Sequence, residues 1–105
     1  RGFIHRDFHP WNVLWNGGLA GVVDWSQASV GPIAMDVAHC RANLAIGFDV
    51  ATADEFKGQW ESKSGGSHST YWDLITCIDF IPDWRPSARG NEQLETWVRH
   101  LVANS

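Results

Sequence analysis

Two short apolar runs near the start of the chain flank a turn. Residues 12–15 and 19–25 are mostly apolar, and an Asn-Gly-Gly segment separates them. Asn and Gly tolerate the positive backbone φ angles of tight hairpin turns. The pattern predicts a β-hairpin over about residues 12–25. Because the far ends of such a ribbon are paired, Asn12 and Asp24 are expected to be neighbours in space.

After residue 31 the apolar spacing changes to that of helices. Pro32 suits the first turn of a helix, which Gly47 closes. A capping-box pattern at residues 52–55 predicts a second helix that ends at about Glu61. The apolar positions of the first helix are Ile33, Val37, Cys40 and Leu44.

Two further helices are predicted after a Ser- and Gly-rich break at residues 64–67. The third contains Trp72, Ile75, Ile78 and Phe80 and ends before Pro82, and residues 83–90 form a loop. The fourth contains Leu94, Trp97, Val98, Leu101 and Val102.

The segment 26–31 is predicted to be a loop as well. The fold class is therefore α+β, with one hairpin followed by about four helices within residues 32–105.

Composition narrows the functional classes. A chain of 105 residues with 44% hydrophobic residues suits one small globular domain. The net charge of −4 argues against nucleic acid as a partner. No apolar run approaches the ~20 residues that span a bilayer, so no membrane partner is expected. Cys40 and Cys77 are expected to be buried free thiols. Four of the seven Trp could wall a pocket, but core packing is the better default for them: Trp11, Trp25, Trp72 and Trp84.

The chemistry is suggested by four residues in a fixed order. His5, Asp7 and Asn12 follow the catalytic-loop pattern H-R-D-x-x-x-x-N, and Asp24 ends the next apolar run. Phosphoryl transfer needs a carboxylate that accepts the proton of the substrate hydroxyl, which is the role predicted for Asp7. An amide oxygen and a carboxylate suit Mg²⁺, so Asn12 and Asp24 are predicted to hold a Mg-nucleotide.

Other residues of the loop are expected to support its shape. His5 is predicted to pack or hydrogen-bond within the loop, and Pro10 to stiffen the turn between Asp7 and Asn12. His9 is read as a hydrogen-bonded scaffold residue rather than a ligand.

Two alternatives remain open from the residues alone. The spacing H-x-D-x-H would allow a Zn-dependent hydrolase that uses His5, Asp7, His9 and Asp24, although Pro10 disfavours an extended strand there. The second alternative is a non-catalytic binding module that keeps the loop as a scaffold.

The segment Ile4-His5-Arg6-Asp7-Phe8-His9-Pro10-Trp11-Asn12-Val13-Leu14-Trp15, followed by Gly21-Val22-Val23-Asp24-Trp25, resembles the aminoglycoside phosphotransferase family. That family has a protein-kinase-like fold and also includes choline-kinase-like enzymes. The His-Pro pair and the Asp-Trp step both favour it over a protein kinase. The resemblance implies that Asp7 is the catalytic base, that Asn12 and Asp24 bind Mg²⁺, and that ATP or GTP is the donor.

The resemblance extends into residues 31–38. It implies that Asp36 is a buried helix carboxylate that receives backbone N–H groups of the catalytic loop. Two positions depart from the family pattern, because Gly31 stands where Asp is usual and Val37 where Leu is usual.

Within such a fold the chain corresponds to part of a C-terminal lobe. The catalytic loop spans residues 3–12, the hairpin 12–25 and the helical part 32–105, while no nucleotide-binding N-terminal lobe is recognised. The chain is therefore expected to be a fragment of a cytoplasmic kinase, inactive in isolation. Apolar surface around Phe3, Ile4, Phe8, Val13 and Trp15 is expected to drive self-association.

The acceptor is the least defined feature. The resemblance implies that the acceptor is a small molecule with a hydroxyl group. The enzyme would then be either a resistance enzyme or a metabolic kinase. The later helices are rich in Asp and Glu, which would suit a cationic acceptor such as an aminoglycoside or choline. A position on the solvated faces of amphipathic helices explains these acidic residues better than an acidic binding cleft does.

Overall fold

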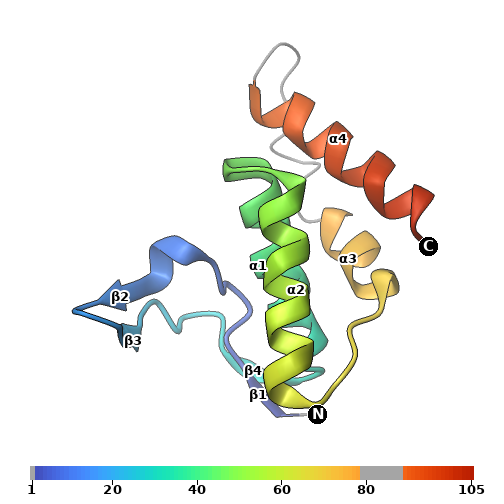
Figure 1. The fold of residues 1–105 in the computed structure, drawn as a ribbon. Coiled ribbons are helices and arrows are strands. Elements are labelled where there is room, and N and C mark those ends of the chain that lie inside the picture. Colours follow the sequence, from blue (N-terminus) through green and yellow to red (C-terminus); the bar gives the residue numbers. More distant parts are fainter. Residues whose placement is uncertain (1, 79–88) are drawn as a thin grey trace.

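The computed structural model describes residues 2–78 and 89–105. The described residues form an α+β fold with two small antiparallel strand pairs and four α-helices (Figure 1). The fold class and the four helices agree with the prediction. In chain order the elements are β1 (Gly2–Ile4), the 3-10 turn η1 (Pro10–Asn12), β2 (Val13–Trp15), β3 (Leu19–Val22), β4 (Ser29–Gly31), α1 (Ala34–Gly47), α2 (Val50–Ser64), α3 (Thr70–Cys77) and α4 (Arg89–Ala103).

The predicted hairpin is present as the pair β2–β3. Val13 pairs with Val22 and Leu14 with Gly21, and the register is irregular between Leu14 and Trp15. Gly17 adopts a φ of 72°, which a residue without a Cβ accepts at no steric cost. Figure 1 shows the hairpin projecting from one side of the helical body, away from α3 and α4.

The second strand pair was not predicted. β1 pairs with β4, so that Phe3 lies opposite Val30, and the assignment of residues 26–31 to a loop is wrong for Ser29–Gly31. Three-residue strands show no periodicity that a sequence can reveal. Gly31 permits the close approach, since a Cβ there would lie 2.8 Å from Cδ1 of Ile4.

Helix α2 begins earlier than the capping-box pattern indicated. Asp49 is its N-cap residue and accepts a hydrogen bond from the Thr52 backbone N–H at 2.7 Å, so the helix starts at Val50. The Thr52 hydroxyl donates to the same Asp49 oxygen at 2.6 Å. These two bonds, the side-chain one foremost, hold the pKa of Asp49 below its ordinary value. The helix also runs past Glu61, to Ser64.

Helices α3 and α4 agree with the prediction in kind and differ at their ends. Ser69 caps α3, which begins at Thr70 and contains Trp72 and Ile75 as predicted, whereas Ile78 is its C-cap residue. Helix α4 begins at Arg89, inside the segment predicted as a loop. The predicted positions Phe80 and Pro82, and the loop residues before Arg89, lie outside the described residues.

The core lies among the four helices. Trp97 of α4 is fully buried and packs with small residues of α1 and α2, namely Ala42, Ala45 and Ala53. Small side chains let helix axes approach closely, which leaves room for one large aromatic ring. Both cysteines are buried free thiols, as expected, and Cys77 belongs to this core.

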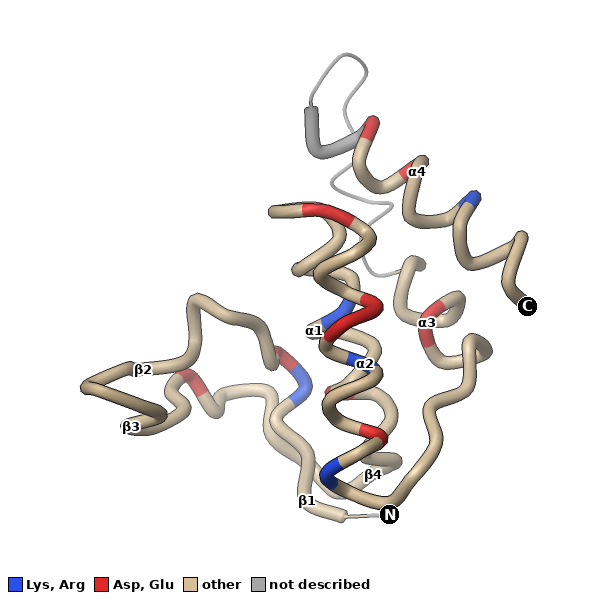
Figure 2. The backbone as a smooth tube through the Cα atoms, in the orientation of Figure 1, with Lys and Arg blue, Asp and Glu red and all other residues tan. Residues whose placement is uncertain are grey.

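A buried ion network crosses the same core. Arg41 of α1 donates to Asp73 of α3 and, at 2.7 Å, to Asp54 of α2, and its guanidinium lies 4.9 Å from the centre of the Trp97 ring. His68 contacts the other oxygen of Asp73 at 2.7 Å. Asp73 is thus a fully buried, paired carboxylate rather than part of a solvated helix face. Figure 2 shows other acidic positions scattered along α2 and α4.

The expectation of core packing is wrong for Trp11 and Trp25, which are exposed. Trp15 is exposed too, as expected for the apolar surface near the start of the chain, and all three belong to the loop and strand segment rather than to the helices. Trp84 lies outside the described residues. Trp11 stacks on Phe48 with ring centres 6.1 Å apart.

Candidate functional site

The loop between β1 and β2 is a strained turn that presents Asp7. Arg6 has a φ of 70°, a left-handed conformation that is uncommon for a residue with a long side chain. Pro10 starts the 3-10 turn η1, which closes when the Asn12 N–H donates to the His9 carbonyl at 3.0 Å. Strained backbone of this kind persists only where surrounding contacts fix it.

Asp36 supplies the first of these contacts. Its Oδ2 accepts the backbone N–H of His5 at 2.7 Å, and its Oδ1 accepts that of Arg6 at 2.8 Å. These are loop N–H groups of the kind that the resemblance assigned to Asp36, although the side chain is half-buried rather than buried. Charge-assisted bonds to two consecutive N–H groups fix the loop to the first turn of α1.

His5 connects the loop to the end of the hairpin. Its ring is buried; Nδ1 accepts the backbone N–H of Asp7 at 3.1 Å, and Nε2 lies 2.7 Å from the Val23 carbonyl oxygen. Since a carbonyl only accepts, the proton must be on Nε2, which makes the ring neutral. His5 therefore spans the gap between Asp7 and the residue just before Asp24.

The Asp7 carboxylate lies at the centre of a polar cluster and is 35% exposed. Its Oδ1 is 3.2 Å from Nε2 of His39 and 3.4 Å from Nε2 of His9. Its Oδ2 lies 3.3 Å from Nδ2 of Asn12. The carboxylate is thus held from several sides and remains accessible to a solute.

Asn12 is buried and turned so that its amide nitrogen faces Asp7. Nδ2 donates to the Asp7 carbonyl at 2.8 Å and lies within reach of the Asp7 carboxylate. These two acceptors use both hydrogens of the Asn12 amide, so the amide has none left to donate to Nε2 of His9, which lies 3.2 Å away. Nε2 of His9 therefore donates toward Asp7 instead. The Asn12 side-chain oxygen then points away from Asp7.

Asp24 lies at the far end of the hairpin, next to the strand partner of Asn12. The Val23 N–H donates to the Asn12 carbonyl at 2.8 Å, which brings the backbones of residues 12 and 24 close together. Asp24 has a φ of 62° and an exposed side chain, and its Oδ1 accepts a bond from the Ser26 hydroxyl at 3.1 Å. It is the second non-glycine residue of the site with left-handed backbone.

The zinc alternative has no ligand set. Within residues 2–78 and 89–105 no group of three or more His, Cys, Asp or Glu side chains could hold a metal ion. Both ring nitrogens of His5 are already engaged by the backbone of Asp7 and Val23, which removes one of the four ligands proposed.

Comparison with known proteins identifies the family. Residues 1–74 match the model of the phosphotransferase enzyme family. The chain belongs to this phosphotransferase family. No curated protein and no solved structure matches the chain. None of the helices in the described part of the chain is long and apolar enough to cross a membrane.

One residue of the candidate site was missed by the sequence reasoning. His39 lies on α1 one turn after Asp36 and contacts the Asp7 side chain. Residues three apart share a helix face, so the assignment of Asp36 to the loop already implied that position 39 would face it too.

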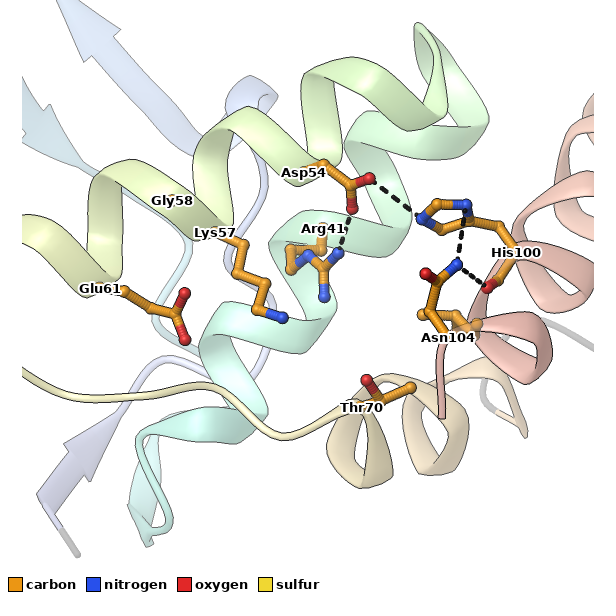
Figure 3. Close-up of a pocket in the computed structure, with 9 residues that line it drawn as sticks. Arg41, Asp54, Lys57, Gly58, Glu61, Thr70, His100 and Asn104 are labelled. Atoms are coloured by element: carbon orange, nitrogen blue, oxygen red, sulfur yellow. Dashed lines mark hydrogen bonds and ion pairs between the residues drawn. The ribbon is translucent and has the colours of Figure 1, made fainter.

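A second polar pocket lies apart from this site. It has a volume of about 370 Å³ and is bordered by α1, α2, α3 and α4 (Figure 3). Asp54 joins Arg41 and His100 across it, at 2.7 and 3.0 Å. Its lining contains neither Asp7 nor Asn12 nor Asp24, and consists of Arg41, Asp54, Lys57, Gly58, Glu61, Thr70, His100, Leu101 and Asn104.

Proposed function

We propose that the protein carrying this chain is an ATP-dependent small-molecule O-phosphotransferase in which Asp7 is the catalytic base. The observation that carries the proposal is the cluster around Asp7. A partly exposed carboxylate lies beside the Asn12 amide, in a loop that Asp36 anchors to α1. Phosphoryl transfer requires mainly that the acceptor hydroxyl be oriented and its proton received, which such a carboxylate does.

Asn12 and Asp24 suit the role of Mg²⁺ ligands. The orientation of the Asn12 amide leaves its oxygen available, and the Asp24 carboxylate is exposed at the neighbouring end of the hairpin. Both supply the hard oxygen ligands that Mg²⁺ prefers. When bound, the metal would neutralise charge on the nucleotide phosphates. The left-handed backbone at Asp24 fits a residue whose position is constrained by function.

The acceptor is proposed to be a small molecule with a hydroxyl group. ATP and GTP are both suitable donors, and a cytoplasmic location would supply either. A cationic acceptor finds limited support, because the buried Asp73 and the half-exposed Asp54 are already paired with Arg41. An uncharged or weakly charged alcohol is therefore proposed alongside aminoglycosides and choline.

The 105-residue chain alone is proposed to lack useful activity and to self-associate. Phe3 and Trp15 are 69% and 70% exposed, and Leu14 and Leu19 of the hairpin are exposed as well. Ile4 does not belong to this surface, contrary to expectation, because it is buried. Exposed apolar residues and short unpaired strand edges favour association between copies. Sedimentation of the isolated chain at micromolar concentration tests this, and a monodisperse monomer would contradict it.

Transfer of ³²P from γ-labelled ATP or GTP tests the proposed function, with kanamycin A and choline as probe acceptors. Asp24→Ala should abolish Mg²⁺-dependent nucleotide binding, measured by titration calorimetry with and without EDTA. Glu55→Ala, which removes an exposed acid of α2, is the control and should bind normally. Unchanged Mg²⁺-dependent binding by Asp24→Ala would exclude Asp24 as a ligand.

A further inference from the structure

His39 approaches the Asp7 carboxylate from a different element than the loop itself. Its Nε2 lies 3.2 Å from Oδ1 of Asp7, although the two residues are 32 positions apart in the chain. The imidazole is 18% exposed, so water competes only weakly for this contact. The Asn43 amide donates to the His39 carbonyl at 2.9 Å, within the same helix.

The donor in this contact follows from the chemistry of the two groups. An ionised carboxylate only accepts hydrogen bonds, so Nε2 of His39 must carry the proton. His9 approaches the same oxygen at 3.4 Å, from within the loop. Oδ1 of Asp7 thus faces two imidazoles, while Oδ2 has, among the described residues, a single polar contact, at 3.3 Å with Nδ2 of Asn12, and keeps a lone pair for an acceptor hydroxyl.

The same face of α1 holds three consecutive residues of the loop. Asp36 accepts the N–H groups of His5 and Arg6, and His39, one turn later, contacts the side chain of Asp7. The first two contacts fix the backbone of the loop, but neither fixes the side-chain rotamer of Asp7. A contact from a helix restrains that rotamer more firmly than one from the loop, because α1 packs against the helical core.

We infer that His39 is a positioning residue for Asp7: its Nε2–H holds Oδ1 and thereby directs Oδ2 toward the acceptor hydroxyl. The inference rests on the proposed role of Asp7 as base. A misplacement of about 1 Å in a reacting group can lower a rate about 100-fold, so loss of this bond should reduce turnover more than binding.

The test compares three variants of the protein that carries this chain. His39→Leu removes the donor, whereas His39→Gln keeps an N–H at the position of Nε2. His100→Leu is the matched control, because His100 is a partly buried histidine of α4 outside the site. Turnover is measured as phosphate release from Mg-ATP with water as the acceptor, and the nucleotide KM in the same assay.

His39→Leu should lower kcat about 10- to 100-fold and change the nucleotide KM less than about twofold. His39→Gln should restore most of the turnover, and His100→Leu should retain it. Equal turnover in His39→Leu and wild type would overturn the inference, as would a His39→Gln variant no better than His39→Leu.

A second readout does not depend on turnover. Long-range ¹H–¹⁵N spectra of ¹⁵N-histidine-labelled protein should show a proton on Nε2 of His39, and Asp7→Asn should shift that resonance. A bare Nε2, or a resonance that Asp7→Asn leaves unmoved, would refute the inference. If wild type releases no phosphate to water, the spectra still decide the His39 contact. Failure of ³²P transfer to the probe acceptors remains the outcome that counts against the proposed function.

Discussion

The loop and strand segment (residues 2–31) and the helical part differ in the interactions that stabilise them. The strand segment exposes Phe3, Trp11, Trp15 and Trp25 and has left-handed backbone at two non-glycine residues. The helical part buries Trp97 and Leu101 and encloses a paired ion network. The first region gains its shape from polar contacts, and the second from burial of apolar surface.

Helix α1 belongs to both regions. One face bears Asp36 and His39, which contact the loop, and another bears Arg41, Ala42 and Ala45, which face the core. The residues of the candidate site therefore lie in the weakly packed region but take their positions from a helix that the core makes rigid. Mutations that destabilise the core should therefore be distinguishable from mutations that disturb only the site.

The largest effect on stability is expected in the core. Asp73→Asn removes one charge from a buried pair and should lower the free energy of unfolding by about 3 kcal/mol, since the Arg41 charge remains buried. Urea unfolding measures this. Asp54→Asn is the control, because its side chain is 45% exposed and screened by water, and should cost less than about 1 kcal/mol. Equal costs for both variants would show that the network is not a buried one.

A smaller loss of stability, with a larger effect on the site, is expected at Asp36. In Asp36→Asn one carboxylate oxygen becomes an NH₂ group that faces a loop N–H, which removes a charge-assisted bond worth about 1.5–3 kcal/mol. Amide exchange at His5 and Arg6 should accelerate while exchange in α4 does not. Unaltered exchange at both loop residues would mean that α1 does not anchor the loop.

The cysteines report on the two regions separately. Burial, and secondarily Asp36, raises the pKa of Cys40 to about 12, and burial, with a contribution from Asp73, raises the pKa of Cys77 to about 11. Both thiols are therefore protonated in the folded protein at pH 8 and should resist alkylation. Cys40 lines an apolar cavity under the hairpin, so local opening should expose it before Cys77.

Timed alkylation with iodoacetamide, followed by peptide mass spectrometry, checks that order. The raised pKa values also determine how the free energy of unfolding changes with pH. The thiols favour the folded state below the unfolded pKa of 9.0, and this contribution is lost as the pH rises through 9 toward 11–12. Equal alkylation rates for the two thiols at pH 8 would contradict the difference in local stability between the regions.

Several features of the fold could be predicted because they depend on local chemistry. The hairpin follows from its Asn-Gly-Gly turn, and the helices follow from apolar spacing and from Pro32 and Gly47. The start of α2 was predicted too late, because the capping-box pattern pointed to Thr52 whereas Asp49 forms the cap in the folded chain. The β1–β4 pair depends on a contact between distant three-residue segments, which leaves no periodic signal.

The candidate site likewise combines features that follow from local sequence with features that depend on tertiary packing. Asp7, Asn12 and Asp24 were predicted from their order in the sequence, and their roles stay predictions. The contacts of His39 and the Arg41–Asp73–His68 network depend on how α1 is rotated about its axis, which tertiary packing decides. The helical spacing from Asp36 to His39 was the one sequence signal available for that rotation.

The most direct test of the central claim is the effect of Asp7→Ala on turnover and on nucleotide binding, measured in the same preparation of the protein that carries this chain. A catalytic base acts in the transition state, so the turnover number should fall about 100- to 10,000-fold while the nucleotide Kd changes less than about twofold. A variant that keeps most of its turnover would exclude Asp7 as the base and would remove the foundation of the proposed function.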